Sequence, residues 1–299
     1  MAVITLLSMK ARTMKSQLAV MVVMAVMAVA VGACGKEPAI VRATQEVELI
    51  HAIQNALLKS VEAEKSAVLS TTDEESRALA MEAQRFATKI NRLRRDLRQL
   101  VAADGQLRET AQLNAFDAAW GDFEDLDKRL LALAVANTNL KATRLSVSDG
   151  AMVLDRFVDA LVEMQRASAD SGLIRATLAA SISALRVQSL LMAHIPSPDD
   201  AEMTTLEKRI GELSEETDRQ LAAVGEAAAP RPHEKLAEVT KTWSEYRRIV
   251  AEVLRLSRQN TNVLSFDVSV HEKRRVTKDC LAALAALLKT IESVPYGTR

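Results

Sequence analysis

The chain is poor in the residues that strands and tight turns require. Among its 299 residues there are only 9 Gly and 6 Pro, and aromatic side chains make up 3 %. A β-sandwich or an α/β enzyme needs more glycine turns and more aromatic or β-branched strand residues. Hydrophobic residues reach 48 % and charged residues 26 %, which is enough to bury a core. The composition therefore predicts an all-α protein of about two domains.

Neither sign of charge is in excess. Lys and Arg together number 39, Asp and Glu together also number 39, and the formal net charge is zero. A protein that binds nucleic acid is expected to carry a basic stripe or patch. The charge balance therefore gives no support to a nucleic-acid partner.

The signatures of catalysis and of cofactor binding are missing as well. The sequence has no glycine-rich phosphate loop, no Gly-x-Ser-x-Gly and no Cys-x-x-Cys-His. Glu48 with His51, and Asp267 with His271, are isolated pairs, whereas a di-iron bundle needs two Glu-x-x-His pairs and two further Glu. We expect a protein that is not an enzyme and that holds no metal or cofactor.

The N-terminal segment has the pattern of an export signal. Basic residues precede an uncharged run from Leu18 to Ala33, which falls a little short of the ~20 residues of a spanning helix. The run ends in Val31-Gly32-Ala33-Cys34, which resembles the lipobox of bacterial lipoproteins. The resemblance implies that residues 1–33 are a signal peptide and that the Cys34 thiol carries diacylglycerol. An uncleaved anchor helix is the alternative.

The same resemblance suggests where the protein resides. A lipoprotein of this kind is anchored to a cell-envelope membrane and faces the periplasm. Gly35, rather than Asp, follows the cysteine, and by similarity to enterobacterial sorting this favours the outer membrane. Cys280 is the other cysteine; if Cys34 is acylated, no disulfide within the chain can form. We expect Cys280 to be a packed thiol in a helix.

Residues recur at a constant separation along the chain. The two tryptophans, Trp120 and Trp243, are 123 residues apart. The same offset relates Phe123 to Tyr246, Asn137–Asn139 to Asn260–Asn262, Ser146-Val147 to Ser269-Val270, and Ser60 to Ser183. A common period over this span predicts an internal duplication. One unit has the length of a four-helix bundle.

Helix-breaking residues, and the lines of apolar residues (seams) along one face of each helix, predict how the helices are arranged. Steps of three and four relate Ile90, Leu93 and Leu97. The same steps relate Phe116, Ala119, Phe123, Leu126 and Leu130, and this is the spacing of knobs-into-holes packing. Asp149-Gly150 is interpreted as a turn, and Ala151–His194 as one long helix, either straight or bent near Ser171-Gly172. We therefore predict two tandem up-down-up-down bundles, 34–170 and 171–299, that share this connecting helix.

Polar residues interrupt the predicted seams. The third-helix seam runs through Asn137 to Arg144 in the first copy and through Asn260 to Asp267 in the second, and Glu64 lies on a first-helix seam. Burying such groups is unfavourable unless they are paired. They either fix helix register by internal pairing or line a pocket for a small ligand, and Glu64 either pairs with Arg144 or lies at a solvated end. The charge run His271–Arg275 is interpreted as a solvated face.

The order of these motifs resembles a known family. Val61-Glu62-Ala63-Glu64-Lys65, Phe116–Trp120, Leu131–Ala134, Asn137–Asn139 and Ser146–Gly150 are similar to segments of the four-helix-bundle sensor domain of methyl-accepting chemotaxis receptors. The similarity covers about residues 40–170 well and is fainter over 171–293, where Val187-Gln188 replaces the Glu-Lys pair. The resemblance implies periplasmic sensing of a small molecule or a partner by helix displacement.

Two functions follow as hypotheses. Receptors of this family continue into a second membrane helix, a HAMP linker and a cytoplasmic coiled coil, and no such segments precede Arg299. The first hypothesis is a lipid-anchored sensor that acts through a signalling partner protein or a homodimer. The second is a structural or assembly lipoprotein that uses helix faces for docking.

Overall fold

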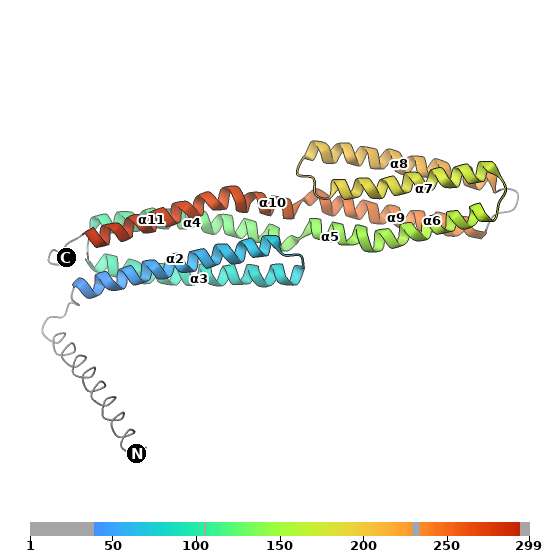
Figure 1. Ribbon diagram of the computed structural model, residues 1–299. Coiled ribbons are helices and arrows are strands. Elements are labelled where there is room, and N and C mark those ends of the chain that lie inside the picture. The colour runs from blue at the N-terminus through green and yellow to red at the C-terminus, as the bar shows by residue number, and fades with distance from the viewer. Residues whose placement is uncertain (1–38, 105, 229–233, 294–299) are drawn as a thin grey trace, which may run out of the picture. The chain divides into compact units, whose positions relative to one another are not determined.

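The computed structural model describes residues 39–104, 106–228 and 234–293, and every regular element among them is helical (Figure 1). The all-α prediction is confirmed. Cys34 lies outside the described residues. The elements are α2 (Ala39–Leu69), α3 (Asp73–Asp104), α4 (Leu107–Ala136), α5 (Thr138–Leu145), the π-helix η1 (Ser146–Gly150), α6 (Ala151–Arg166), α7 (Ser171–His194), α8 (Asp200–Ala227), α9 (Glu234–Gln259), α10 (Thr261–Val268), the π-helix η2 (Ser269–Lys273) and α11 (Arg274–Ser293).

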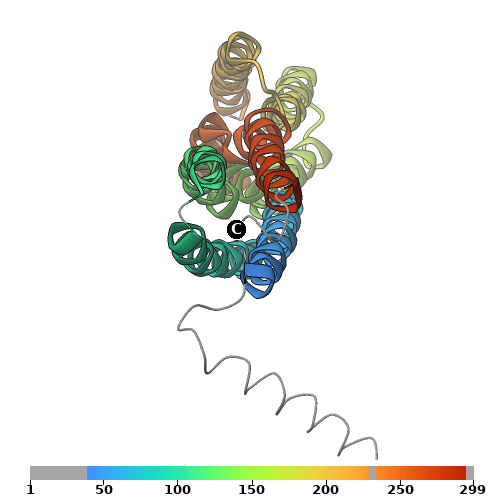
Figure 2. The same cartoon turned by 90° about the vertical axis from the view of Figure 1, so that its left-hand side faces the viewer.

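The chain divides into two compact units. Unit 1 contains the described parts of Met1–Gln54, Asn91–Phe116 and Ala282–Arg299. Figure 2 shows the ends of α2, α3, α4 and α11, which belong to this unit, around one axis. Its buried side chains include Ile50, Ile53, Leu97, Leu113, Leu284 and Leu287. The predicted seam residues Leu93 and Leu97 are among the buried ones, as the three-four spacing requires.

Unit 2 comprises Asn55–Ile90 and Asp117–Leu281 and holds two side-chain clusters. The first cluster joins α2, α3, α4 and α10 and consists of Val68, Leu130, Leu131 and Val268 together with five alanines, Ala63, Ala67, Ala80, Ala83 and Ala134. Alanine at these positions lets helix backbones approach closely. Two buried hydroxyls use that proximity, because Ser60 donates to the carbonyl of Ala83 (3.2 Å) and Ser76 to that of Ala134 (3.0 Å).

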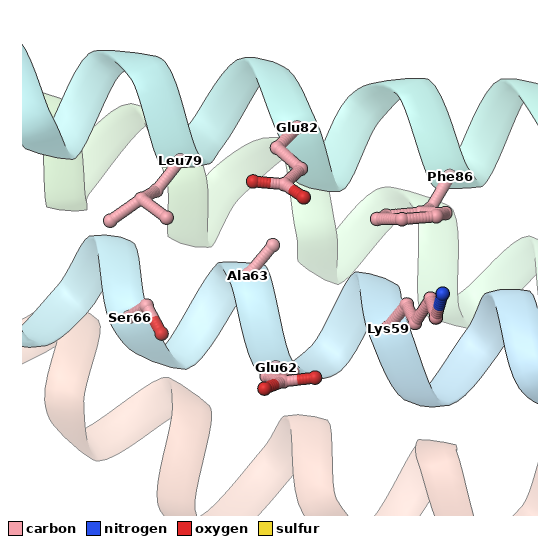
Figure 3. A pocket seen from close by; sticks show the side chains of 7 residues that line it. All are labelled: Lys59, Glu62, Ala63, Ser66, Leu79, Glu82 and Phe86. Carbon is pink, nitrogen blue, oxygen red and sulfur yellow. The ribbon is translucent and has the colours of Figure 1, made fainter.

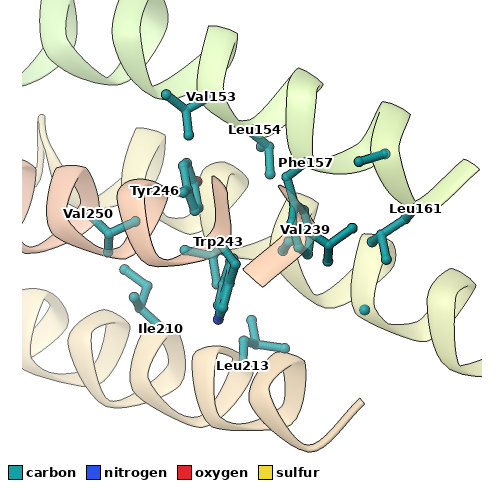
Figure 4. Close-up of a cluster of buried hydrophobic side chains, with 14 of the residues drawn as sticks. Val153, Leu154, Phe157, Leu161, Ile210, Leu213, Val239, Trp243, Tyr246 and Val250 are labelled. Atoms are coloured by element: carbon teal, nitrogen blue, oxygen red, sulfur yellow. The ribbon is translucent and has the colours of Figure 1, made fainter. Parts of the chain in front are cut away.

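The second cluster of unit 2 is larger and more aromatic. It joins α6, α7, α8 and α9, and Figure 4 shows its centre. The Trp243 ring lies 5.3 Å from that of Phe157 and 5.8 Å from that of Tyr246, within the range of favourable aromatic pairs. Trp243 Nε1 donates to Asp218 (2.7 Å), so the indole is buried without an unpaired donor.

The connectivity differs from the predicted tandem bundles. Residues Ser146–Gly150 do not turn the chain back, because Gly150 has helical angles (φ −62°, ψ −50°) and η1 continues directly into α6. The predicted long helix Ala151–His194 is instead broken at residues 167–170, where Asp170 accepts from the Leu173 N–H and caps α7. The predicted turn and the predicted connecting helix were both wrong.

As a result, the two copies exchange their fourth helices. Segments α5 and α6 pack against α7 and α9, which follow them in the sequence. Segment η2 bonds to α2 and α4 instead, through Ser269 and Lys273. The core of the second cluster therefore spans residues on both sides of the predicted boundary at 170/171.

One described helix has the length and apolar composition of a membrane-crossing helix. It is α7, with a mean hydropathy of 1.3 over the qualifying window, 44 % of which is buried inside the protein. A core helix of a soluble bundle meets the same criterion, and α7 contributes Leu173, Ala180, Val187 and Leu191 to the second cluster.

Candidate functional site: the helix crossing and its two polar clusters

Two asparagines break the long helices at equivalent places. Asn137 lies between α4 and α5, and Asn260 lies between α9 and α10, each with a φ of 50°. Asparagine adopts this left-handed conformation more readily than other residues that have a Cβ. Each break exposes the first N–H groups of a new helix, which need partners.

The two new helices cap each other. The Thr138 N–H donates to Thr261 Oγ1 (3.1 Å), and the Thr261 N–H donates to Thr138 Oγ1 (3.2 Å). One residue further on, the Asn139 and Asn262 N–H groups each donate to the other's Oδ1, both at 3.1 Å. A helix is normally capped by its own preceding side chain, whereas here each cap comes from a residue about 120 positions away. We name this group, residues 137–139 and 260–262, the crossing.

The remaining amides tie the crossing to the surrounding loops. Asn137 donates to Asp73 at the start of α3 (3.1 Å) and accepts from Asn262 (3.0 Å). Asn260 donates to the Ser197 carbonyl (2.9 Å) and accepts from Asn139 (2.7 Å). Both polar atoms of Asn137 and of Asn260 are therefore hydrogen-bonded within the chain, which is the internal-pairing arrangement.

A charged cluster is buried between α2, α4 and η2. Lys273 is 1 % exposed, and its Nζ donates to Asp127 (2.6 Å) and to the Phe123 carbonyl (3.0 Å). The same Nζ lies 3.2 Å from the centroid of the Phe123 ring. Glu64, which is fully buried, accepts a hydrogen bond from the Ser269 hydroxyl (2.6 Å).

Burial shifts the ionisation of this cluster. Desolvation raises the pKa of Glu64, against the opposing effects of the Ser269 hydroxyl and the Lys273 charge. Desolvation also lowers the pKa of Lys273, and the Asp127 carboxylate opposes that change. Such groups are stable in a core only as a matched set, because each buried charge is strongly unfavourable when alone.

The equivalent positions near η1 are neutral. Ser146 corresponds to Ser269 by the 123-residue offset, and Gln188 Nε2 donates to its hydroxyl and its carbonyl, both at 3.1 Å. Tyr246 donates to Gln188 Oε1 (2.8 Å). Gly150 corresponds to Lys273, and a Cβ there would lie 3.3 Å from the Leu145 carbonyl oxygen. Single-turn π-helices such as η1 and η2 occur frequently at functional sites.

The polar residues that were predicted to lie together on the core seams lie in different environments in the structure. Glu64 is buried but pairs with Ser269, so neither predicted alternative for it holds. Arg144 and Asp267 are exposed, contrary to the prediction that they lie on the core seam. The left-handed residue at 137 or 260 ends one helix and starts another. The residues after it therefore no longer lie on the helix face that the three-four spacing of the preceding helix predicts. Asp267 lies 3.6 Å from His271, the other member of its pair.

A third polar group links α7, α8 and α9. His194 Nδ1 lies 2.9 Å from Ser257 Oγ, and its Nε2 lies 3.1 Å from Glu207 Oε1. The order Ser-His-Glu is that of a nucleophile triad, but Ser257 and His194 are both fully buried, so no substrate can reach the hydroxyl. Burial lowers the pKa of His194, against the effect of Glu207.

The remaining side chains considered as nucleophiles or metal ligands are buried or isolated. Cys280 is buried, as expected, and desolvation raises the pKa of its thiol to about 12. Within the described residues, no group of three or more His, Cys, Asp or Glu side chains could hold a metal ion.

Open grooves lie between α2 and α3 and between α8 and α9. The α2–α3 groove, of about 310 Å³, is shown in Figure 3 and lined by Lys59, Glu62, Ala63, Ser66, Leu79, Glu82 and Phe86. Lys59 Nζ lies 5.9 Å from the Phe86 ring centroid. A groove of about 480 Å³ between α8 and α9 is lined by residues that include Asp218, Trp243 and Arg247. None of the five predicted ligand residues lines these grooves.

A family model matches part of the chain. The model of the four helix bundle sensory module for signal transduction matches residues 174–294, which contain most of α7 and all of α8, α9, α10, η2 and α11. No curated protein and no solved structure matches the chain significantly. The match supports the sensor resemblance, and it falls on the copy for which the motif similarity is fainter.

Proposed function

We propose that the protein is a lipid-anchored sensory module of the cell envelope that has no catalytic activity and acts through another protein. The match of residues 174–294 to a sensory module for signal transduction supports the sensor role. The lipobox-like Val31–Cys34 supports the anchor and a periplasmic location, with the outer membrane favoured. The repeat of key residues at 123 positions supports an origin by tandem duplication.

The observation that carries this proposal is the reciprocal capping of Thr138 and Thr261. The segments α4–α6 and α9–α11 each run from one side-chain cluster of unit 2 into the other and are bonded where they cross (Figure 1). A displacement of either segment alters the hydrogen bonds of the other. Helix displacement in one cluster is thereby coupled to the other, as sensing requires.

The α2–α3 groove is the ligand site that best fits the geometry. It combines the Lys59 ammonium with the Glu62 and Glu82 carboxylates, so it offers partners for both charges of a small amphoteric molecule. Glu64, Asn137 and Asn260 are buried and would respond to a ligand through packing rather than by contact.

A thermal-shift screen tests the sensor role. Amino acids, amines and organic acids are added to the parent protein, Lys59→Ala and Glu82→Ala. We expect at least one class to raise the Tm of the parent and to have less effect on both variants. Lys128→Ala, which changes an exposed lysine of α4, is the matched control. If no compound changes the parent Tm, the small-ligand form of the proposal fails.

Acylation is tested separately. Globomycin should cause the precursor to accumulate, and Cys34→Ser should abolish labelling by radioactive palmitate. Labelling that persists in the Cys34→Ser variant would exclude the lipobox assignment, whatever the thermal-shift result.

The alternative function is a structural or assembly lipoprotein. The exposed apolar residues on α7 favour this docking role, because large apolar side chains on a surface helix often mark an interaction site. A protein with no ligand response that co-purifies with an envelope assembly would support the docking role over the sensor role.

A further inference from the structure

The two copies present different chemistry to the fourth helix that each of them receives. In the first copy, α2 and α4 contribute the buried Glu64 and Asp127, and the incoming η2 contributes Lys273, whose Nζ donates to Asp127 (2.6 Å). At the 123-residue offset, Glu64 and Asp127 correspond to Val187 and Val250, which are buried and uncharged. Val250 lies among apolar side chains in Figure 4. The first copy therefore needs a cation from its fourth helix, whereas these positions of the second copy cannot pair with one.

The fourth helix that the second copy receives has no side chain at the matching position. Gly150 of η1 corresponds to Lys273 of η2. A Cβ at Gly150 would lie 3.5 Å from Ile249 Cγ2 and 3.9 Å from Gln188 Oε1, so ordinary contacts with α9 and α7 already close the space around it. Gln188 is held in this place by the Tyr246 hydroxyl, which donates to it (2.8 Å). A lysine side chain that entered here would have to displace Ile249 or Gln188.

Returning each fourth helix to its own copy would mismatch both sites. With α5 and η1 packed on α2 and α4, Gly150 would face Asp127, and that buried carboxylate would have no cation. With α10 and η2 packed on α7 and α9, Lys273 would be buried near Val187 and Val250. Both outcomes are unfavourable, because removing one partner of a buried ion pair is far more destabilising than the intact pair is stabilising.

We propose that the Asp127–Lys273 pair, opposed to Val250 and Gly150, selects which fourth helix each copy accepts and thereby determines the exchanged connectivity. The two segments are otherwise alike where they enter, since Ser146-Val147 recurs as Ser269-Val270. Apolar spacing alone therefore does not distinguish them. Partners are discriminated by the unfavourable contacts of the wrong pairing as much as by the favourable contacts of the right one.

The selection matters because the exchange is what joins the two side-chain clusters of unit 2. In the exchanged fold, the segments α4–α6 and α9–α11 both run from one cluster into the other. With the fourth helices returned, each copy would close on itself, and a displacement in one cluster would no longer reach the other. The selection itself does not depend on the sensory role.

Chemical cross-linking can report which arrangement forms. In the exchanged fold, Arg156 of α6 donates to Glu245 of α9 (3.1 Å). With the fourth helices returned, Arg156 would lie beside Asp122 of α4, which corresponds to Glu245 at the 123-residue offset. In the exchanged fold Arg156 and Asp122 are on the order of 50 Å apart, because nearly continuous helix separates them. A short bismaleimide should therefore join Arg156→Cys to Glu245→Cys only in the exchanged fold (the exchanged product) and Arg156→Cys to Asp122→Cys only in the other (the returned product).

The test compares full-length chains that are unfolded in urea and refolded at low concentration before cross-linking. Every chain carries Cys34→Ser and Cys280→Ala, so that the reporter thiols are the only ones. The parent should give the exchanged product alone. Asp127→Val combined with Lys273→Ala removes the charged pair and should give both products.

A second variant moves the cation instead of removing it. Lys273→Ala combined with Gly150→Lys places a lysine on η1, so Asp127 finds its cation only when the fourth helices are returned. The returned product should then predominate. Asp125→Ala combined with Lys128→Ala removes an exposed ion pair of the same helix, α4, and is the matched control. This control should give the exchanged product alone, as the parent does.

Circular dichroism and thermal unfolding accompany each cross-linking reaction. A variant without Asp127 and Lys273 that keeps the parent's helix content, melts at a lower temperature and still gives only the exchanged product would overturn the proposal, because the pair would then serve stability alone. A parent that gives both products would overturn it as well, and so would a folded Gly150→Lys variant that gives only the exchanged product. If the Gly150→Lys variant does not fold, the variant without the charged pair decides.

Discussion

The backbone N–H of Thr138 is capped by Thr261, and the N–H of Thr261 is capped by Thr138, at 3.1 Å and 3.2 Å. Neither helix start supplies its own side-chain cap, since Asn137 and Asn260 make no side-chain cap bond. The stability of each helix start therefore depends on the presence of the other.

This mutual dependence predicts strong coupling between Thr138 and Thr261. Thr138→Val and Thr261→Val each remove one acceptor and should each lower the free energy of unfolding by about 1–2 kcal/mol, the usual effect of losing a cap. The double variant should lose clearly less than the sum, because either substitution alone already removes the hydrogen bond between the two hydroxyls (3.1 Å). Urea unfolding of all four proteins measures the coupling, and strict additivity would contradict reciprocal capping.

Asn137 and Asn260 should be intolerant of side chains that disfavour left-handed angles. Asn137→Leu has to adopt a φ of 50° and also loses the bonds to Asp73 and Asn262. The conformational cost alone is about 1–2 kcal/mol. Asn137→Gly loses the same bonds without that cost, so it should be the more stable variant. A leucine variant as stable as the glycine variant would argue against the left-handed break.

Lys273 should be essential for stability because it is the ion-pair partner of the buried Asp127. Lys273→Met leaves the buried Asp127 carboxylate without its partner and should lower the unfolding free energy by about 3–5 kcal/mol. Lys273→Met combined with Asp127→Leu should recover part of that loss, because the unpaired Asp127 carboxylate is then gone and Glu64 keeps its hydrogen bond from Ser269. Lys128→Met, on the exposed side of α4, should have little effect. Thermal and urea unfolding measure both comparisons.

Acid should weaken the α7–α8–α9 junction through His194. Its pKa is lowered in the folded protein from the ordinary 6.5, so the unfolded chain binds the proton more tightly. The contribution of neutral His194 to the free energy of unfolding is therefore complete above about pH 6.5. It is lost as the pH falls through the pKa of His194 in the folded protein. Below pH 4.5, protonation of Glu207 adds to the loss, because its bonds to Arg258 and His194 outweigh burial and lower its pKa.

A histidine variant separates this contribution from general acid denaturation. His194→Gln keeps a side chain that can bond Ser257 but does not titrate. Its unfolding midpoint in urea should change less between pH 7 and pH 5.5 than that of the parent. Equal pH dependence of the two proteins would show that His194 does not contribute.

The sequence alone predicted helices and their inward faces well, because three-four spacing follows directly from helix geometry. Ile90, Leu97, Phe116 and Phe123 were all assigned to seams and are all fully buried. The repeated Asn-Thr-Asn was also visible. Its conformation was not, because asparagine occurs in ordinary helices as well as in left-handed positions, and nothing local indicated that the partner of Thr138 would be Thr261.

The exchange of the fourth helices was hidden for a related reason. Asp149-Gly150 has the composition of a turn, and only packing against α7 and α9 keeps it helical. Lys273 was misread as part of a solvated charge run because its partners, Asp127 and the Phe123 carbonyl, lie on a helix about 150 residues earlier. Local patterns report the face of a helix but not which distant helix covers it.

The hydrogen bond between Glu64 and Ser269 spans 205 residues of chain. If the protein crosses a membrane from its N-terminus, α2, α3 and α4 emerge first and must wait for η2, almost at the end of the chain, before their charged cluster can be neutralised. Contacts of such long sequence separation form slowly. During that interval the early helices offer an incomplete bundle to chaperones and proteases, so the yield of the protein in the envelope should depend on export rate as much as on final stability.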